Sequence, residues 1–142
     1  MKTPRTNPAP VFGRTAGGLL AASLEDHSWI AVPVRTGLRI AKLLGAGLVI
    51  GTSTSPAKRA RLGEFGADLA LDSNNPDWVR QVLDATDGKG VDLVIDMLAG
   101  SLFNATMQAT RIGGRIVNVG RMAGDSGSVD FNLHSLRRIT YV

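Results

Sequence analysis

Residues 48–59 read LVIGTSTSPAKR, and the order of apolar, polar and capping residues in this stretch decides the fold. Leu48–Ile50 is short and wholly apolar, which predicts a buried strand. Ser55 then supplies an N-cap, and Pro56 suits the first turn of a helix because an N–H has no intrahelical partner there. We expect this helix to run from Pro56 to Phe65. A buried strand that leads into a capped helix is the first half of a βαβ unit.

The same alternation of short apolar runs and helical periods continues on both sides of this stretch. Further strands are predicted at Leu69–Leu71, Leu93–Ile95, Ile116–Val119 and Ile139–Val142. Helices are predicted at Leu38–Leu44, Asp77–Thr86 and Ser101–Thr110, with one helical turn at Leu133–Leu136 and a turn at Gly113–Gly114. This alternation is typical of a parallel sheet covered by helices on both faces. With 142 residues for one core, the sequence predicts a single α/β domain with a doubly wound, Rossmann-like sheet.

The pattern weakens toward the amino terminus. Residues 1–28 begin with MKTPRTNPAP, which has three prolines and no apolar block, so we expect an irregular or disordered lead-in. The Rossmann-like domain is then expected over residues 29–142. Its first strand would be Trp29–Val34, although Pro33 removes a ladder hydrogen bond from that strand.

Composition excludes several classes of site and partner. The chain has no cysteine, which excludes disulfides and cysteine-ligated metal sites and leaves the cytoplasm as the default compartment. No apolar run approaches the roughly 20 residues of a membrane span. The net charge is +4, with scattered basic residues and no nucleic-acid recognition motif. We therefore expect a weak general attraction to anions, with neither a membrane nor a nucleic acid as partner.

Cofactor chemistry is expected at the carboxyl ends of the strands, where an open parallel sheet binds its ligands. The loop that follows Leu48–Ile50 carries four hydroxyls and two cations but no acid. NAD-binding proteins usually place a carboxylate there for the ribose hydroxyls, whereas hydroxyls and cations at a helix N-terminus suit a 2′-phosphate. The alternative is a solvated capping loop in which Lys58 and Arg59 are ordinary surface residues.

Two more predicted strand ends carry polar residues or glycine. Asp96 would orient backbone amides or cap the next helix. Asn118 and Gly120 would bond an amide and allow close approach of a flat ring, or else form an ordinary strand-to-loop turn. The glycine-rich turn that binds a pyrophosphate is missing, because residues 31–37 hold a single glycine.

Four stretches in order carry a family resemblance. They are IAKLLGAGLVIGTSTSPAKRARLGEFGADLALD at 40–72, TDGKGVDLVIDMLAG at 86–100, RIGGRIVNVGRMAG at 111–124 and LRRITYV at 136–142. From Gly37 to Val142 the sequence resembles the nucleotide-binding domain of the medium-chain dehydrogenase/reductase superfamily. It is most similar to the zinc-independent quinone oxidoreductases and to alcohol dehydrogenases of the zinc type.

The resemblance implies a cofactor and an activity. The cofactor would be NADPH, with its 2′-phosphate on Lys58, helped by Thr54 and Ser55, and its nicotinamide beside the strand end at 118–120. The cofactor-binding residues expected on this basis are Thr52, Thr54, Ser55, Lys58, Asn118, Val119 and Gly120. The family's usual activity is hydride transfer to a quinone, an enone or a similar carbonyl compound.

Departures from the family limit that inference. Val32–Val34 stands where the family has its glycine-rich turn, and residues 1–36 do not resemble the family's separate catalytic domain. No catalytic residue and no metal ligand are therefore assigned. His27 and His134 are acid–base candidates by residue type alone, with surface or capping roles as the alternative.

Two further expectations concern function and partners. The competing function is a non-catalytic remnant that keeps the fold without turnover. A methyltransferase is disfavoured because it would ordinarily carry an acid near residues 52–55. The partner would be a second copy, paired through the C-terminal edge strand, or a missing catalytic segment.

Overall fold

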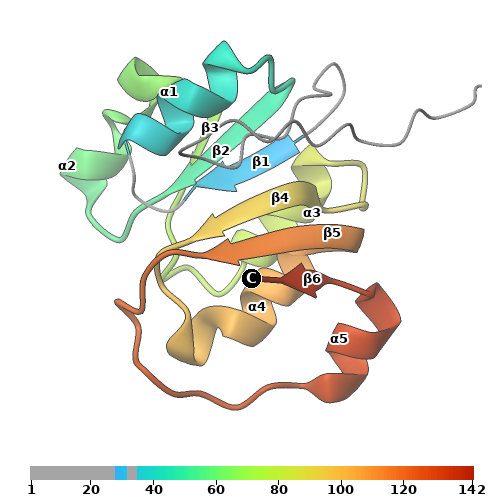
Figure 1. The fold of residues 1–142 in the computed structure, drawn as a ribbon. Helices are drawn as coiled ribbons and strands as arrows, with labels where there is room; N and C mark the ends of the chain where they lie inside the picture. The colour runs from blue at the N-terminus through green and yellow to red at the C-terminus, as the bar shows by residue number, and fades with distance from the viewer. Residues whose placement is uncertain (1–27, 32–34) are drawn as a thin grey trace, which may run out of the picture.

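In the computed structural model of the protein, which describes residues 28–31 and 35–142, six strands form one sheet (Figure 1). The strands are β1 (Ser28–Ala31), β2 (Leu48–Thr52), β3 (Leu69–Leu71), β4 (Val91–Asp96), β5 (Thr110–Asn118) and β6 (Thr140–Tyr141). Every neighbouring pair is parallel, and the spatial order is β3-β2-β1-β4-β5-β6. This is the strand order of a dinucleotide-binding fold, so the predicted doubly wound, Rossmann-like sheet is confirmed.

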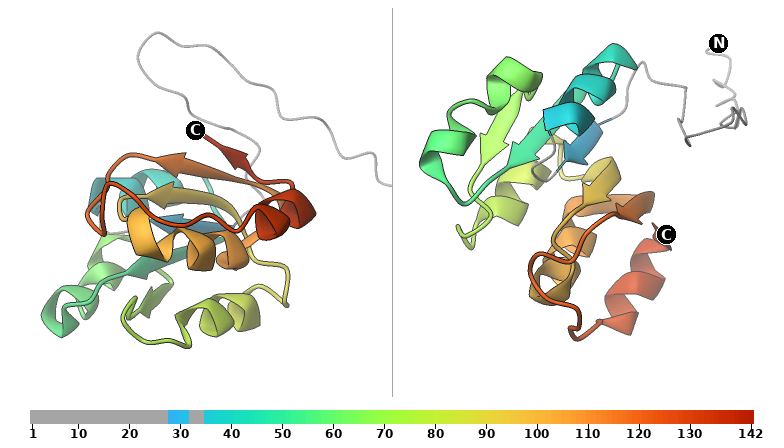
Figure 2. Two further views of the ribbon diagram at one scale, coloured as in Figure 1. Left: turned by 90° about the horizontal axis from the view of Figure 1, so that it is seen from below. Right: turned by 60° about the vertical axis from the view of Figure 1, so that its left-hand side comes forward.

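Helices cover both faces of the sheet (Figures 1 and 2). They are α1 (Arg35–Leu43), α2 (Pro56–Arg59), α3 (Trp78–Ala85), α4 (Phe103–Ala109) and α5 (Phe131–Arg137), with 3₁₀ turns η1 (Leu62–Phe65) and η2 (Gly100–Leu102). One core cluster joins α3 and α4 to the sheet through Trp78, Val82 and Met107. A second cluster joins α1 and η1 to the opposite face through Leu38 and Leu62. None of the helices within the described ranges is long and apolar enough to cross a bilayer.

The first strand occupies the centre of the sheet. β1 pairs with β2 on one side and with β4 on the other, and it ends at Ala31, two residues before Pro33. Ser28, which we assigned to the lead-in, is the first residue of β1. Residues 1–27 and 32–34, including the expected lead-in and the rest of the predicted strand, lie outside the described residues.

The helix predicted from Pro56 to Phe65 is interrupted. α2 ends at Arg59, and the chain tightens into 3₁₀ geometry, with the Arg61 N–H bonding to the Lys58 carbonyl at 3.1 Å. This change buries Leu62 against the second core cluster. The predicted end after Phe65 is confirmed, since Gly66 has φ +100° and its N–H closes η1.

The predicted turn at Gly113–Gly114 proves to be a bulge inside β5. Val91 of β4 pairs with Thr110, whereas Leu93 pairs with Arg115, so β5 holds extra residues between the two pairs. A Cβ on Gly114 would lie 2.6 Å from the Thr110 Cγ2 atom. The glycine therefore permits the chain to fold back on itself before the main part of the strand.

Candidate functional site

The candidate site lies at the carboxyl ends of β2, β4 and β5, around the point where the strand order reverses between β1 and β4 (Figure 1). An open parallel sheet binds its ligands in the crevice at this point, because the loops beyond the strands diverge there. Three segments form this edge: the loop at 52–59, the turn at 96–100 and the loop at 118–124.

The loop after β2 starts buried and becomes exposed. Thr52 and Ser53 are 1% and 7% exposed, and the Ser53 Oγ atom accepts a hydrogen bond from the Ser55 N–H at 3.3 Å. The Ser55 Oγ atom in turn accepts from the Lys58 N–H at 3.4 Å, which confirms Ser55 as the N-cap of α2. Thr54 is exposed at the tip of the loop. The hydroxyls therefore shape the loop while Thr54 remains available to a ligand.

The two adjacent cations of this loop have different roles. The Arg59 guanidinium donates to the Ser53 carbonyl at 2.8 Å and pairs with the Asp72 carboxylate at 3.1 Å. Lys58 is exposed, and its ammonium makes no hydrogen bond or ion pair with any residue that the structure describes. Arg59 thus fixes the loop to the end of β3, whereas the charge of Lys58 is free to meet an anion.

Lys58 opens onto a cavity of about 440 Å³. Its lining comprises Ser53, Ala57, Lys58, Arg61, Leu62, Phe65, Met97 and Met122. Four members of this lining that sequence reasoning did not single out add a second cation, an aromatic ring and two thioethers: Arg61, Phe65, Met97 and Met122. Arg61 was detectable in principle, because it follows Lys58 by three residues and so lies on the same side of a helical segment.

Arg61 is held beside the cavity by two neighbours. Its Nε atom donates to the Glu64 carboxylate at 3.1 Å, and its guanidinium carbon lies 5.8 Å from the centre of the Phe65 ring. Arg39 of α1 approaches the same ring at 5.2 Å. The acid nearest in sequence to Lys58 is therefore already engaged by Arg61. The cavity wall keeps a positive character as a result.

Asp96 organises the turn after β4. One carboxylate oxygen accepts from the N–H groups of Leu98 and Ala99, at 2.8 and 3.1 Å. Ala99 has φ +49°, which is uncommon for a residue with a side chain. The amide-orienting role predicted for Asp96 is confirmed. Its other carboxylate oxygen is buried without a hydrogen-bond partner among the described residues, as is the Thr52 hydroxyl.

Those two buried polar atoms fit a site for a polar ligand. Thr52 ends β2 and Asp96 ends β4, and β1 lies between these two strands. A buried polar atom without a hydrogen-bond partner is uncommon in a folded protein and needs a physical explanation. A dinucleotide-binding fold places its ligand in the crevice at the point where the strand order reverses, and these two strand ends flank that point.

The loop after β5 is bonded to the turn after β4. The Asn118 side-chain amide donates to the Gly120 carbonyl at 2.8 Å, and the Val119 N–H donates to the Asp96 carbonyl at 2.8 Å. A Cβ on Gly120 would lie 2.9 Å from the Met97 carbonyl oxygen, so packing within the protein already requires this glycine. The side chain of Val119 is 53% exposed at the edge. The loop therefore offers a flat ring mainly an apolar contact.

The described residues do not fit a metal site. The chain has no cysteine, and residues 28–31 and 35–142 contain no group of three or more His, Asp and Glu residues placed to hold an ion. His134 lines a different pocket, of about 260 Å³, with Phe103, Phe131 and Tyr141 on the β6 side of the sheet. His27 lies outside the described residues.

Comparisons with known proteins agree with this geometry. Residues 36–142 match the family described as zinc-binding dehydrogenase. The chain is 29% identical over 140 residues to a probable quinone oxidoreductase of Schizosaccharomyces pombe, covering 88% of this chain and 41% of that protein. It is 38% identical over 82 residues to a phenolphthiocerol/phthiocerol polyketide synthase of Mycobacterium tuberculosis, covering 58% of this chain and 4% of that protein.

Solved structures of dehydrogenases also resemble the chain. The crystal structure of an NAD-dependent alcohol dehydrogenase superposes with a TM-score of 0.77 at 31% identity, covering 84% of this chain and 36% of that one. In these comparisons the chain spans less than half of each relative's length. The matched residues include all three loops of the candidate site. The chain therefore belongs to the zinc-binding dehydrogenase family, and its Rossmann-like domain is a nucleotide-binding domain of the medium-chain dehydrogenase/reductase superfamily.

Proposed function

We propose that the chain is the NADPH-binding domain of an oxidoreductase that transfers hydride to a quinone, an enone or a related carbonyl compound. The observation that carries this proposal is the Lys58 ammonium, which has no partner among the described residues and borders the 440 Å³ cavity near the strand-order switch. NADPH differs from NADH only by its 2′-phosphate. A site that favours NADPH must therefore offer cations, and no free carboxylate, where that phosphate lies.

The surrounding charges support the preference for a phosphate. Asp72 is neutralised by Arg59, and Glu64 by Arg61, at N–O distances of 3.1 Å in both pairs. Lys58 would bind the 2′-phosphate directly, with the hydroxyls of Thr54 and Ser55 beside it and Thr52 beneath the ribose. The alcohol dehydrogenase that superposes on the chain is described as NAD-dependent, so fold alone does not decide between the two cofactors.

The nicotinamide would lie against the loop after β5. Val119 and the 70%-exposed side chain of Met122 provide an apolar surface there, and Asn118 positions the backbone around it. When bound, the cofactor supplies the hydride. The chain's own residues orient it and exclude water from one face of the ring.

The substrate side of the reaction requires other residues. Hydride transfer needs a pocket that holds the acceptor against the ring, and the three loops of the site form one wall of such a cleft. We propose that a further segment or partner supplies the opposite wall, without a zinc ion bound by the described residues. A second copy is a further proposed partner, because Thr140 and Tyr141 leave β6 exposed at the edge of the sheet.

A non-catalytic remnant is the second candidate function. It is favoured by the sequence Val32-Pro33-Val34, which lacks the glycines that let backbone amides surround a pyrophosphate. Each charge-assisted hydrogen bond lost there would cost about 1.5–3 kcal/mol, so losing two would weaken binding by roughly two to four powers of ten.

Calorimetric titration of the chain with NADPH and with NADH tests the proposal. We expect weak binding, with a dissociation constant above about 1 µM, and a preference for NADPH. Equal binding of both cofactors would remove the assignment to NADPH. Complete absence of binding would favour the remnant.

A further inference from the structure

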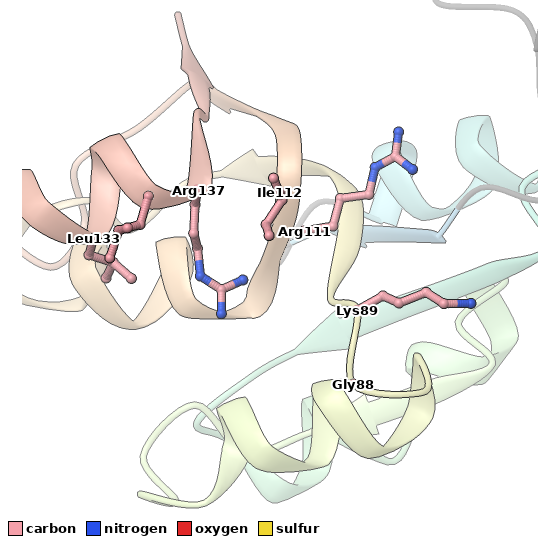
Figure 3. Close-up of a pocket in the computed structure, with 7 residues that line it drawn as sticks. Gly88, Lys89, Arg111, Ile112, Leu133 and Arg137 are labelled. Atoms are coloured by element: carbon pink, nitrogen blue, oxygen red, sulfur yellow. The ribbon is translucent and has the colours of Figure 1, made fainter.

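A second cavity lies at the ends of the strands opposite the cofactor loops. Figure 3 shows residues that line it. It has a volume of about 600 Å³ and lies at the amino ends of β4 and β5. Its side chains come from three places: Lys89 in the turn before β4, Arg111 and Ile112 at the start of β5, and Leu133, Leu136 and Arg137 in α5. Because parallel strands all point the same way, this cavity and the cofactor site are separated by the length of the strands.

The apolar part of the lining is unusually exposed. Leu136 is 75% exposed and Ile112 is 57% exposed, although both are large aliphatic side chains. Leu133 continues this surface inward, where it packs against the core cluster beneath α5. Exposed aliphatic residues that share one concave surface mark a binding site more often than isolated ones do.

Arg137 places a charge inside this cavity. One of its terminal nitrogens donates to the Thr110 carbonyl at 2.6 Å, which anchors the guanidinium, and its other N–H groups make no hydrogen bond with a residue that the structure describes. Figure 3 shows Arg137 directed into the space between α5 and Ile112. A guanidinium fixed by one backbone bond is preorganised for a second, charge-assisted bond with an anion.

Two other cations make the far rim positive. Arg111 pairs with the Asp92 carboxylate at 2.7 Å, so that part of its charge is compensated. Lys89 is exposed and makes no ion pair with a residue in the described part of the chain. The charged ends of both lie on the side of the view away from α5 (Figure 3). Three cations of the described residues thus border the cavity, and the Asp92 carboxylate is paired with one of them, Arg111.

We propose that this cavity binds an amphiphilic organic anion. Its apolar chain would lie over Ile112, Leu133 and Leu136, and its carboxylate or phosphate would meet the free N–H groups of Arg137. A volume of about 600 Å³ is within the range of small-ligand pockets, roughly 300–1,000 Å³. The site is independent of the cofactor loops, because none of its lining residues belongs to residues 52–59, 96–100 or 118–124.

Calorimetric titration of the full chain with decanoate and with decyl phosphate tests this proposal, with decanol as the uncharged probe of equal chain length. We expect a dissociation constant of roughly 0.1–1 mM for at least one anion and binding of decanol at least about ten-fold weaker. Binding of only one of the two anions would identify the headgroup.

Variants locate the site and supply the control. Arg137→Gln should weaken decanoate binding by about ten-fold, and Lys89→Gln by about two- to five-fold. Lys89→Gln keeps the test decisive even if Arg137→Gln unfolds the chain. Arg80→Gln removes the same charge from the outer surface of α3, where Arg80 is 70% exposed, and should change nothing.

Three results would overturn the proposal: equal affinity for decanol and decanoate, unchanged affinity in whichever of the Arg137→Gln and Lys89→Gln variants folds, or displacement of decanoate by NADPH. A chain that fails to bind NADPH but binds decanoate as described would refute the proposed function and leave this site standing.

Discussion

The loops after β2 and β5 lie at the same edge of the sheet, yet they use their polar groups in opposite ways. In the loop after β2, Lys58 keeps a free charge on the cavity because Arg59 provides the internal contacts. In the loop after β5, the Asn118 amide bonds within the protein, and Gly120 is required by the Met97 carbonyl. Residue types at the strand ends therefore indicate where in the sheet a ligand would bind. Hydrogen bonds within the protein decide which loop still has polar groups to offer that ligand.

Asp96→Ala should give the largest effect in this comparison. It removes the acceptor of two N–H groups in a turn where Ala99 has positive φ, and we expect a loss of about 2–4 kcal/mol in unfolding free energy. Urea denaturation measures it. Asp96→Asn is the matched control, because it keeps one side-chain oxygen as acceptor and should cost less. A loss below about 0.5 kcal/mol for Asp96→Ala would show that the turn does not depend on this carboxylate.

Gly120→Ala should also act on stability first. The added Cβ would lie 2.9 Å from the Met97 carbonyl oxygen, so the loop or the turn must shift at a cost of about 1–3 kcal/mol. Gly63→Ala is the control, since a Cβ added there would meet no other atom within 4 Å, and we expect little change in stability. If Gly120→Ala left stability unchanged and weakened only cofactor binding, the glycine would serve ring approach instead of internal packing.

Sequence reasoning predicted the sheet because burial at the strands is a local property. Short apolar runs such as Leu48–Ile50, when they alternate with helical periods, are typical of strands in a parallel sheet covered by helices, and this pattern is visible in the residue types. The interruption of the helix after Arg59 was missed because it depends on the packing of Leu62 in the second core cluster, which is a tertiary contact. The bulge in β5 was missed for the same reason, although its glycine pair was noticed.

The candidate site could be predicted only in part. The absence of an acid and the presence of Lys58 are properties of the sequence alone. The different roles of Lys58 and Arg59 cannot be seen in the sequence alone. They depend on Asp72, which lies thirteen residues beyond Arg59 and at the end of another strand. Met97 and Met122 belong to loops that only the fold brings beside α2, so no local signal places them in the same cavity.

Lys58→Ala tests the free charge directly. We expect NADPH binding to weaken by about 1–2 kcal/mol, or roughly five- to thirty-fold, and NADH binding to stay almost unchanged, because the cofactors differ only by the 2′-phosphate. The effect should fade as salt rises, since exposed charges are screened over about 8–10 Å. Arg59→Ala is the neighbouring control. It should lower stability and shift both cofactors alike, because Arg59 anchors the loop. Equal effects of Lys58→Ala on both cofactors would show that residues 52–59 form an ordinary capping loop and not a site for the 2′-phosphate.

Substitutions in the Arg61–Glu64 pair should have the smallest effects on NADPH affinity, and the two substitutions should act in opposite directions. Its charge lines the same cavity as Lys58 but is shared with Glu64, and both side chains are more than half exposed, at 55% and 58%. Arg61→Ala should therefore weaken NADPH binding by only about 0.5–1 kcal/mol, or roughly two- to five-fold. Glu64→Gln should act in the opposite direction, because it removes the carboxylate that competes with the 2′-phosphate for the guanidinium. We expect it to strengthen NADPH binding by up to about two-fold and to leave NADH unchanged, as measured by parallel calorimetric titrations. If Glu64→Gln weakened NADPH binding instead, Glu64 would be needed to hold Arg61 in place, and the positive wall of the cavity would depend on the ion pair itself.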